Sequence, residues 1–355
     1  STPLYSSAAS DVYKRQEINM KNITKVGLSA LAGTLAFTSA QAGEVSITGS
    51  MIASYTQKGG YNTNGNPFGM NKELTVSATG ELDNGTSVAY KQTITNAMGY
   101  NDSELVFTGL PMMGDATVAL TSAGAPISAI DDVTPIAFEE ASAAVGSLKD
   151  VNGADGNYGI RYTLADAMGS GMTIDAFYTP NADGDAQAEK GTGGVNGSAE
   201  DAWEVVIKGS VPGVDGLDIG AGYATQSHHN DTATTADSQD GDEGTFYINY
   251  AFGALKVGAQ RGVTNTAGTG EISYDNEYLG VSYAVSDNLS ISYNTIDSTK
   301  STGNGAQVEQ DFDSVSLSYT SGGMTIGVLD ADCGNCSYTA NRDQSARSIQ
   351  MTIAF

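Results

Sequence analysis

Basic residues are scarce in this chain. Lysine and arginine together number 16 against 41 aspartate and glutamate residues, which gives a formal net charge of −25. A nucleic-acid-binding surface needs clustered positive charge to contact phosphates, so nucleic acid is not an expected partner. Acidity of this size is also typical of solvated surface loops, so the positions of the carboxylates matter more than their number.

Long apolar runs are also missing, apart from one near the start. Residues 20–42 combine a basic beginning, the apolar stretch Val26–Phe37 and the small-residue end Ala40–Ala42. This pattern predicts a Sec signal peptide, because the apolar stretch is far shorter than the ~20 residues of a spanning helix. We interpret residues 1–19 as a non-native or read-through extension, and we expect the exported chain to be residues 43–355.

No second apolar run of about 18 residues follows the signal peptide, which excludes helical membrane spans. A membrane barrel remains compatible with this absence. Only alternate residues of its strands face lipid, so a hydropathy average does not reveal it.

Cysteine occurs twice, at Cys333 and Cys336 in the sequence C-G-N-C. In an exported chain, this spacing indicates a local disulfide or two idle thiols. A redox or metal site is the alternative, but it would need partner residues that the sequence does not show.

Histidine also occurs twice, at the adjacent positions His228 and His229 in an acidic loop, and no G-x-S-x-G motif is present. A hydrolytic triad is therefore not expected, and we predict that the protein is not an enzyme. No cofactor is expected either. Acidic clusters at Asp183–Asp185 and Asp237–Glu243, the second with Asp240 and Asp242, are weak candidates for Ca²⁺ binding. Their spacing does not match an EF-hand, and solvated loops are the alternative.

Alternation of polar and apolar residues dominates the rest of the chain. In residues 44–57, Val45, Ile47, Met51 and Tyr55 share one parity and serines and threonines share the other, which predicts a two-sided strand. Sixteen such segments occur, at residues 44–57, 72–82, 86–95, 103–110, 116–122, 158–164, 172–178, 201–208, 217–225, 245–251, 255–263, 277–284, 289–297, 311–319, 324–331 and 345–355.

The connections between these segments alternate between short and long. An even number of strands with sorted loop lengths predicts an all-β fold, namely a 16-stranded antiparallel transmembrane β-barrel with short periplasmic turns and long extracellular loops. A soluble sandwich has no reason to sort its loops, and no solenoid repeat is present. Aromatic residues near strand ends fit the interfacial girdles of a membrane barrel, although tyrosine is common in strands of any kind. These aromatic residues are Tyr55, Tyr162, Tyr178, Tyr223, Tyr250, Tyr283, Tyr293, Tyr319 and Phe355.

Together, several features resemble the Gram-negative bacterial general porins. These are a signal peptide ending A-Q-A, a first strand reading E-V-S-I-T-G-S, the sixteen strands, an enlarged third long loop and the terminal Phe355. The resemblance implies an outer-membrane homotrimer surrounded by lipid and lipopolysaccharide, and passive diffusion of small hydrophilic solutes and ions. It also implies that the third loop folds into the lumen, and that Phe355 is an assembly signal read by the barrel-assembly machinery.

The third long loop, residues 123–157, is the candidate pore constriction. It carries Asp131, Asp132, Glu139 and Glu140, and its apolar stretches argue against a purely solvated external loop, which is the alternative. If the loop folds inward, these carboxylates bias ion entry at the narrowest point of the channel.

Basic side chains on the lumen parity are expected to face this loop. They are Lys91, Arg161, Lys208 and Lys256, of which Lys91 and Arg161 are the preferred candidates, with ordinary lumen solvation as the alternative. Because acids outnumber bases, we predict a weak to moderate cation preference. A surface-displayed adhesin or antigen and a substrate-specific channel remain alternative functions.

Overall fold

The computed structural model describes residues 42–61, 65–95, 100–111, 113–122, 124–182, 199–228 and 238–355. The predicted extension, nearly all of the predicted signal peptide, His229 and the acidic segment 183–185 lie outside these residues. Within the described residues, no helix has the length and apolarity needed to cross a membrane.

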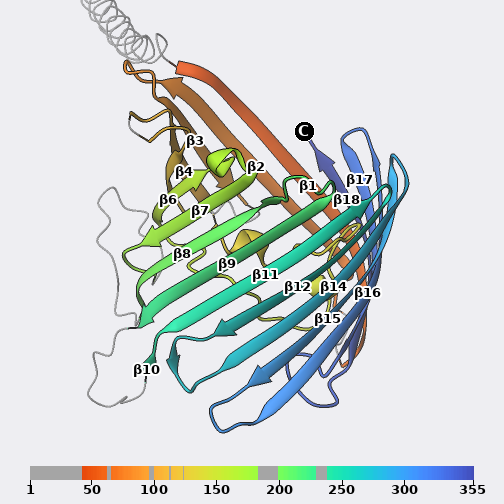
Figure 1. Ribbon diagram of the computed structural model, residues 1–355. Coiled ribbons are helices and arrows are strands. Elements are labelled where there is room, and N and C mark those ends of the chain that lie inside the picture. The colour runs from red at the N-terminus through yellow and green to blue at the C-terminus, as the bar shows by residue number, and fades with distance from the viewer. Residues whose placement is uncertain are drawn as a thin grey trace, which may run out of the picture.

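Sixteen strands form a closed barrel in which each strand pairs antiparallel with its neighbours in sequence, and β18 pairs with β1 to close the ring (Figure 1). This confirms the predicted fold class. The barrel strands are β1 (Ala42–Gly60), β2 (Phe68–Glu81), β3 (Ser87–Ile94), β4 (Tyr100–Thr108), β5 (Thr117–Thr121), β6 (Gly159–Leu164), β7 (Met172–Thr179), β8 (Ala199–Ser210), β9 (Leu217–His228), β11 (Gly241–Phe252), β12 (Leu255–Asn265), β14 (Ser273–Ser286), β15 (Leu289–Ser301), β16 (Gln307–Ser321), β17 (Met324–Gly334) and β18 (Gln344–Ala354). Two short strands, β10 (Ser238–Gln239) and β13 (Gly268–Thr269), form a separate ribbon between connecting loops.

Several strands extend beyond their predicted bounds, by more residues at the end that lies away from the short turns than at the other end. The segment predicted at 277–284 is part of β14, Ser273–Ser286, and the segment predicted at 311–319 is part of β16, Gln307–Ser321. The added residues are mostly polar on both parities, so they lack the apolar alternation that marks a strand. Their backbone groups nevertheless continue the hydrogen-bonded ladder.

The alternation of side chains gives the barrel an apolar outside and a polar inside. On β15 and β16, Tyr293 pairs with Val315 on the outer face, and each is 47% exposed. One residue along, Ser292 pairs with Ser316 on the inner face, and both are buried. Every predicted girdle residue except the half-buried Tyr162 is exposed on the outer face. This apolar outer band suits a lipid environment.

The buried apolar core lies between the barrel wall and a loop inside it. One cluster joins Ala141 and Val145 of the connection between β5 and β6 to Ile296, Phe312 and Leu329 of the wall. A second cluster joins Ile127 and Ile130 of the same connection to the inner faces of β8, β9 and β11. The interior is therefore partly filled along one side.

The seam of the barrel ends at the last residue. Phe355 exchanges two backbone hydrogen bonds with Gly49 of β1, N to O at 2.9 Å and O to N at 2.8 Å. A Cβ atom at Gly49 would lie 2.8 Å from Cε2 of the Phe355 ring, so glycine leaves the space that the ring occupies. The ring is 71% exposed on the outside, where an aromatic side chain suits a membrane interface.

Deletion of Phe355 is expected to reduce insertion into the outer membrane and to leave export across the inner membrane intact. The deletion removes the last seam hydrogen bonds and the terminal ring together. Fractionation followed by gel mobility with and without heating measures the folded, membrane-inserted share. Phe355→Tyr, which keeps the ring, is the control and should insert normally. Unchanged insertion of the deletion variant would contradict the assembly role.

A loop-lined pore as the candidate functional site

The connection between β5 and β6 folds into the barrel, as the family resemblance implies for the third long loop. Its described part, residues 124–158, is called the inner loop here. An outgoing arm, residues 127–139, crosses the inner wall from β8 to β18, and a returning arm, residues 141–155, leads back to β8. Two single-turn helices, η1 (Ser128–Ile130) and η2 (Ala141–Ala143), lie within these arms.

Apolar side chains seat the outgoing arm on the wall. Ile127 and Ile130 pack against Val206 of β8 and against Ala224 and Tyr247 of the next two strands. Further along, glycines leave room for the arm. A Cβ atom at Gly258 or Gly280 would meet Pro135, and one at Gly327 would overlap the Phe138 ring. The arm therefore lies directly against the backbone of the wall.

Polar side chains of the wall satisfy the backbone of the outgoing arm. Gln260 of β12 accepts a hydrogen bond from Val133 N at 2.9 Å and donates to the carbonyls of Ile130 and Asp131 at 2.8 and 2.7 Å. Ser292 of β15 accepts from Ala137 N at 2.8 Å. Such bonds are required because a backbone group buried without a partner costs about 1–3 kcal/mol.

The returning arm is held in the same way, by side chains from four wall strands. Each bond joins one inward-facing side chain to the loop: Asn294 of β15 accepts from Ala141 N, Gln344 of β18 accepts from Gly146 N, Asn276 of β14 donates to Lys149 O and Gln310 of β16 donates to Ser147 O. In addition, the Tyr278 hydroxyl donates to the Asp150 carboxylate.

Two buried or half-buried carboxylates fix the foot of the inner loop. Glu204 of β8, which is 1% exposed, accepts from Ile127 N at 3.2 Å and from Ala154 N at 2.6 Å, and so joins the two arms at their common end. Glu243 of β11 accepts from the adjacent amides Asn152 N and Gly153 N at 2.5 and 2.7 Å. Each carboxylate thus acts as a two-point anchor for backbone N–H groups.

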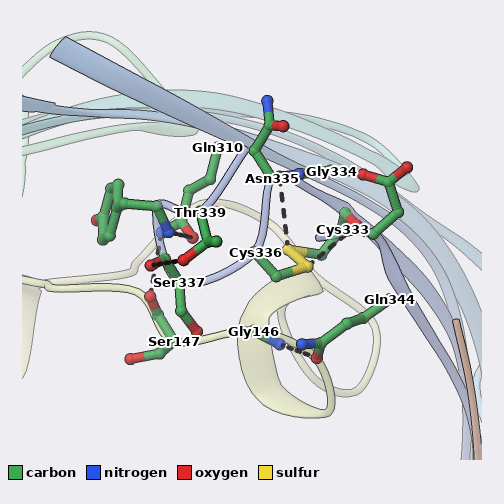
Figure 2. The surroundings of a disulfide bond; sticks show 12 residues. Gly146, Ser147, Gln310, Cys333, Gly334, Asn335, Cys336, Ser337, Thr339 and Gln344 are labelled. Atoms are coloured by element: carbon green, nitrogen blue, oxygen red, sulfur yellow. Dashed lines mark hydrogen bonds between the residues drawn. A yellow bond between two sulfur atoms is a disulfide. The ribbon is translucent and has the colours of Figure 1, made fainter. Parts of the chain in front are cut away.

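The cysteine pair supports the turn between the two arms. Cys333 and Cys336 form a disulfide at the end of β17, and both are buried. Figure 2 shows the disulfide beside Gly146 of the returning arm, where Gln344 accepts the Gly146 amide. A Cβ atom at Gly146 would meet the Phe312 ring at 2.7 Å and Cys333 Sγ at 3.0 Å. The bridge therefore belongs to the packing of the inner loop.

The four predicted constriction carboxylates lie on the inner loop. Asp131, Asp132, Glu139 and Glu140 are all half-buried, and Glu139 accepts a hydrogen bond from Gln350 of β18. Burial raises the pKa of each of them, and the neighbouring Asp132 charge raises the pKa of Asp131 further.

Asp150 of the returning arm is close enough to interact with this group. Burial raises its pKa to about 6, although the hydrogen bond from Tyr278 opposes the shift.

The four predicted basic residues all lie on the inner parity of their strands, but at different places around the ring. Lys91 of β3 and Arg161 of β6 belong to the part of the wall that the two arms leave uncovered. Lys208 and Lys256 lie next to the loop, on the side of the short turns. Each is two residues from a wall residue that contacts the loop, namely Val206 on β8 and Gly258 on β12. Sequence parity alone does not separate these two groups, because the arms' path is set by tertiary packing.

The residues that hold the loop were not singled out by sequence reasoning. They are inward-facing and polar, and they include seven residues of strands between β8 and β16: Glu204, Asn249, Gln260, Asn276, Ser292, Asn294 and Gln310. Five of these seven are amides on the lumen parity, where serine or threonine would suffice for solvation alone, and this is the signal that the sequence carries.

The weak calcium candidates already have other partners. Asp240 accepts the His228 amide at 3.0 Å, and Asp242 accepts from the Asn265 side chain at 2.9 Å. Among the described residues, no three His, Cys, Asp or Glu side chains come together as a metal site. Calcium binding at these loops stays a prediction from sequence.

A closed barrel with an apolar outer band, a polar interior and a loop folded into its lumen defines the class of outer-membrane barrel channels. The chain matches the Gram-negative porin family over residues 27–329, and it belongs to that family. No curated protein shows significant sequence similarity to it.

Solved structures share the fold at low sequence identity. OmpT of Vibrio cholerae superposes with a TM-score of 0.62 at 11% identity, covering 88% of this chain and 97% of that chain. The anion-selective porin from Comamonas acidovorans gives 0.60 at 15% identity, with 88% and 99% covered. OmpF of Salmonella typhi, in complex with daunomycin, gives 0.58 at 11% identity, with 88% and 97% covered.

Replacing Glu204 should loosen the foot of the inner loop. Glu204→Ala leaves the buried Ile127 and Ala154 amides without an acceptor, which costs about 1–3 kcal/mol for each group. We expect a lower temperature for the heat-induced gel shift and noisier single-channel currents. Glu204→Gln, which keeps one acceptor oxygen, should lie between this variant and wild type. Glu309→Ala, which removes an exposed carboxylate of β16, is the matched control. Wild-type behaviour of Glu204→Ala would contradict the anchoring role.

The raised pKa values of the inner-loop carboxylates predict a selectivity that depends on pH. A carboxylate is charged above its pKa, so lowering the pH from about 8 to about 5 neutralises these groups earlier than ordinary carboxyls, whose pKa is near 4. The K⁺ over Cl⁻ permeability ratio, measured from reversal potentials, should therefore fall across this range. The variant carrying Asp131→Asn and Asp132→Asn should show a flatter profile. A profile as steep as that of wild type would contradict the assignment.

Proposed function

We propose that the protein is an outer-membrane diffusion channel for small hydrophilic solutes and ions, with a weak to moderate preference for cations. The observation that carries this proposal is the inner loop, which places Asp131, Asp132, Glu139 and Glu140 inside the barrel. A loop that runs along the wall for its whole length narrows the lumen on one side. Passive diffusion through such an opening needs no cofactor and no catalytic group.

The cation preference follows from where the charges lie. In a narrow lumen with low-dielectric walls, fixed charges are screened less than at an open surface, so a few carboxylates raise the local concentration of cations. Lys149 is the only lysine or arginine in the sequence of this loop. The strength of the preference depends on how many of the carboxylates are ionised.

The proposed setting is a homotrimer in the outer membrane. One structural relative, OmpT of Vibrio cholerae, is described in a trimer form, which supports this assembly. The apolar outer band supports contact with outer-membrane lipid and lipopolysaccharide, and the Phe355 seam supports recognition by the barrel-assembly machinery. Export by a Sec-type signal peptide completes the proposed route.

A barrel that only displays adhesive or antigenic surface loops would not need the inner loop. In this wall, a row of inward-facing side chains binds the inner loop, and these side chains do not reach the outer face of the barrel. A channel explains this arrangement, whereas a display scaffold does not.

Purified protein is expected to raise the conductance of a planar lipid bilayer in discrete steps. In a KCl gradient, the reversal potential should have the sign of K⁺ preference, because the inner-loop carboxylates attract cations. The unheated, SDS-resistant species is the material to insert, and its mass tests the trimer. Absence of conductance would contradict the channel function, and an anion preference would contradict the proposed selectivity.

A further inference from the structure

Two basic side chains of the uncovered wall, Arg161 and Lys91, are each faced by a carboxylate. Arg161 of β6 forms a bidentate ion pair with Asp175 of β7, in which Nε donates to Oδ1 at 2.9 Å and the second guanidinium nitrogen donates to Oδ2. Both side chains are on the lumen parity, and Asp175 is the diagonal neighbour of Arg161, because it lies opposite Thr163 in the paired strands. This fork geometry fixes the guanidinium against its partner.

Asp175 is built into the wall as the partner of Arg161. It is 2% exposed, and the Thr163 hydroxyl also donates to its Oδ1 at 2.8 Å. The guanidinium further interacts with the charges of Glu104 and Glu204. Arg161 is therefore surrounded by negative charge on three strands, and its positive charge is largely cancelled within the wall.

Lys91 of β3 has a similar neighbour. It lies directly opposite Glu104 of β4 in the strand register, and both residues are on the lumen parity. Directly opposed side chains on one face of a sheet lie close enough to interact. The register also places Lys58, Glu73 and Glu81 on the lumen parity of β1 and β2, so this wall has no surplus of positive charge.

We propose that Asp175 and Glu104 are specificity-determining residues, which cancel the positive charges of Arg161 and Lys91 and leave the lumen acidic on both sides. This inference rests on the proposed channel function. The inner loop supplies carboxylates on one side, and the uncovered wall offers no opposing positive surface. The favoured solutes are small inorganic and organic cations, whereas small anions meet repulsion from both sides.

A charge-cancellation cycle tests the Arg161 pair in planar bilayers. Asp175→Asn frees the arginine charge and should lower the K⁺ over Cl⁻ permeability ratio by roughly two- to fivefold, since a unit charge several ångströms from the ion path changes its energy by about RT. Arg161→Gln leaves the carboxylate alone and should raise the ratio. The double variant carries no net change in charge and should return close to wild type.

Two further variants show whether a change in the permeability ratio comes from charge in the lumen or from a general effect on folding. Glu104→Gln removes a second wall carboxylate, which faces Lys91 and also interacts with Arg161, while the Arg161–Asp175 hydrogen bonds stay in place, and it should lower the ratio in the same direction. Asp330→Asn breaks a comparable aspartate–arginine pair, with Arg347, which is exposed on the outer face of the barrel, and it should leave the ratio unchanged. The heat-induced gel shift verifies that each variant is folded.

The outcomes separate this inference from the channel proposal. If wild type conducts but both Asp175→Asn and Glu104→Gln keep its permeability ratio, the inference is overturned and the channel proposal stands. A double variant that behaves like Asp175→Asn would also overturn it, because the arginine charge would then not be the cause. If wild type does not conduct, the channel proposal itself fails. The inference is supported if Asp175→Asn lowers the permeability ratio, Arg161→Gln raises it, and the double variant returns it close to the wild-type value.

Discussion

Every backbone group of a loop that folds into a barrel has to find a hydrogen-bonding partner, and this constraint shapes the interior of the protein. The inner loop has almost no regular secondary structure of its own, so its N–H and C=O groups are not satisfied within the loop. The wall supplies the partners from side chains on successive strands, from Glu204 on β8 to Gln344 on β18. The loop path is therefore set by the order in which these side chains appear around the ring.

This attachment makes the lumen asymmetric. The strands from β8 to β18 are covered by the two arms, and their apolar clusters around Ile127 and Phe312 give the barrel a packed core on that side. The strands from β1 to β6 stay mostly uncovered, and they form the part of the ring that the two arms do not cross. Attachment and electrostatics are thus linked, because the arrangement that satisfies the loop backbone also decides which wall faces Asp131 and Glu140.

The effective charge of the pore depends on how its charged side chains are paired as well as on how many of them there are. Arg161 and Lys91 are lumen residues, and a transverse field would follow if they were free of partners. Asp175 holds the guanidinium in a fork, and Glu104 lies opposite the lysine, so the positive side of such a field is weak. On the outer face the same kind of pair, Arg347 with Asp330, has no access to the ion path. Location relative to the lumen gives one pair a functional consequence and the other none.

The sequence by itself determined the barrel. The alternation at Ile291, Tyr293 and Val315 is a local property of each strand, and sorted connection lengths order the strands, so the closed sixteen-stranded ring with its two faces was predictable. The inward course of the third loop was implied by the family resemblance, and the apolar residues near Ile127 and Phe138 argued against full exposure. Tertiary structure alone decided which part of the wall the loop covers, and so which basic residues, Lys208 and Lys256, lie next to the loop. It alone brought Asp175 to Arg161, fourteen residues away on the next strand. The physical reason is that strand parity is fixed by the two-residue repeat of the chain, whereas pairing between strands and loop depends on register and on packing across the lumen.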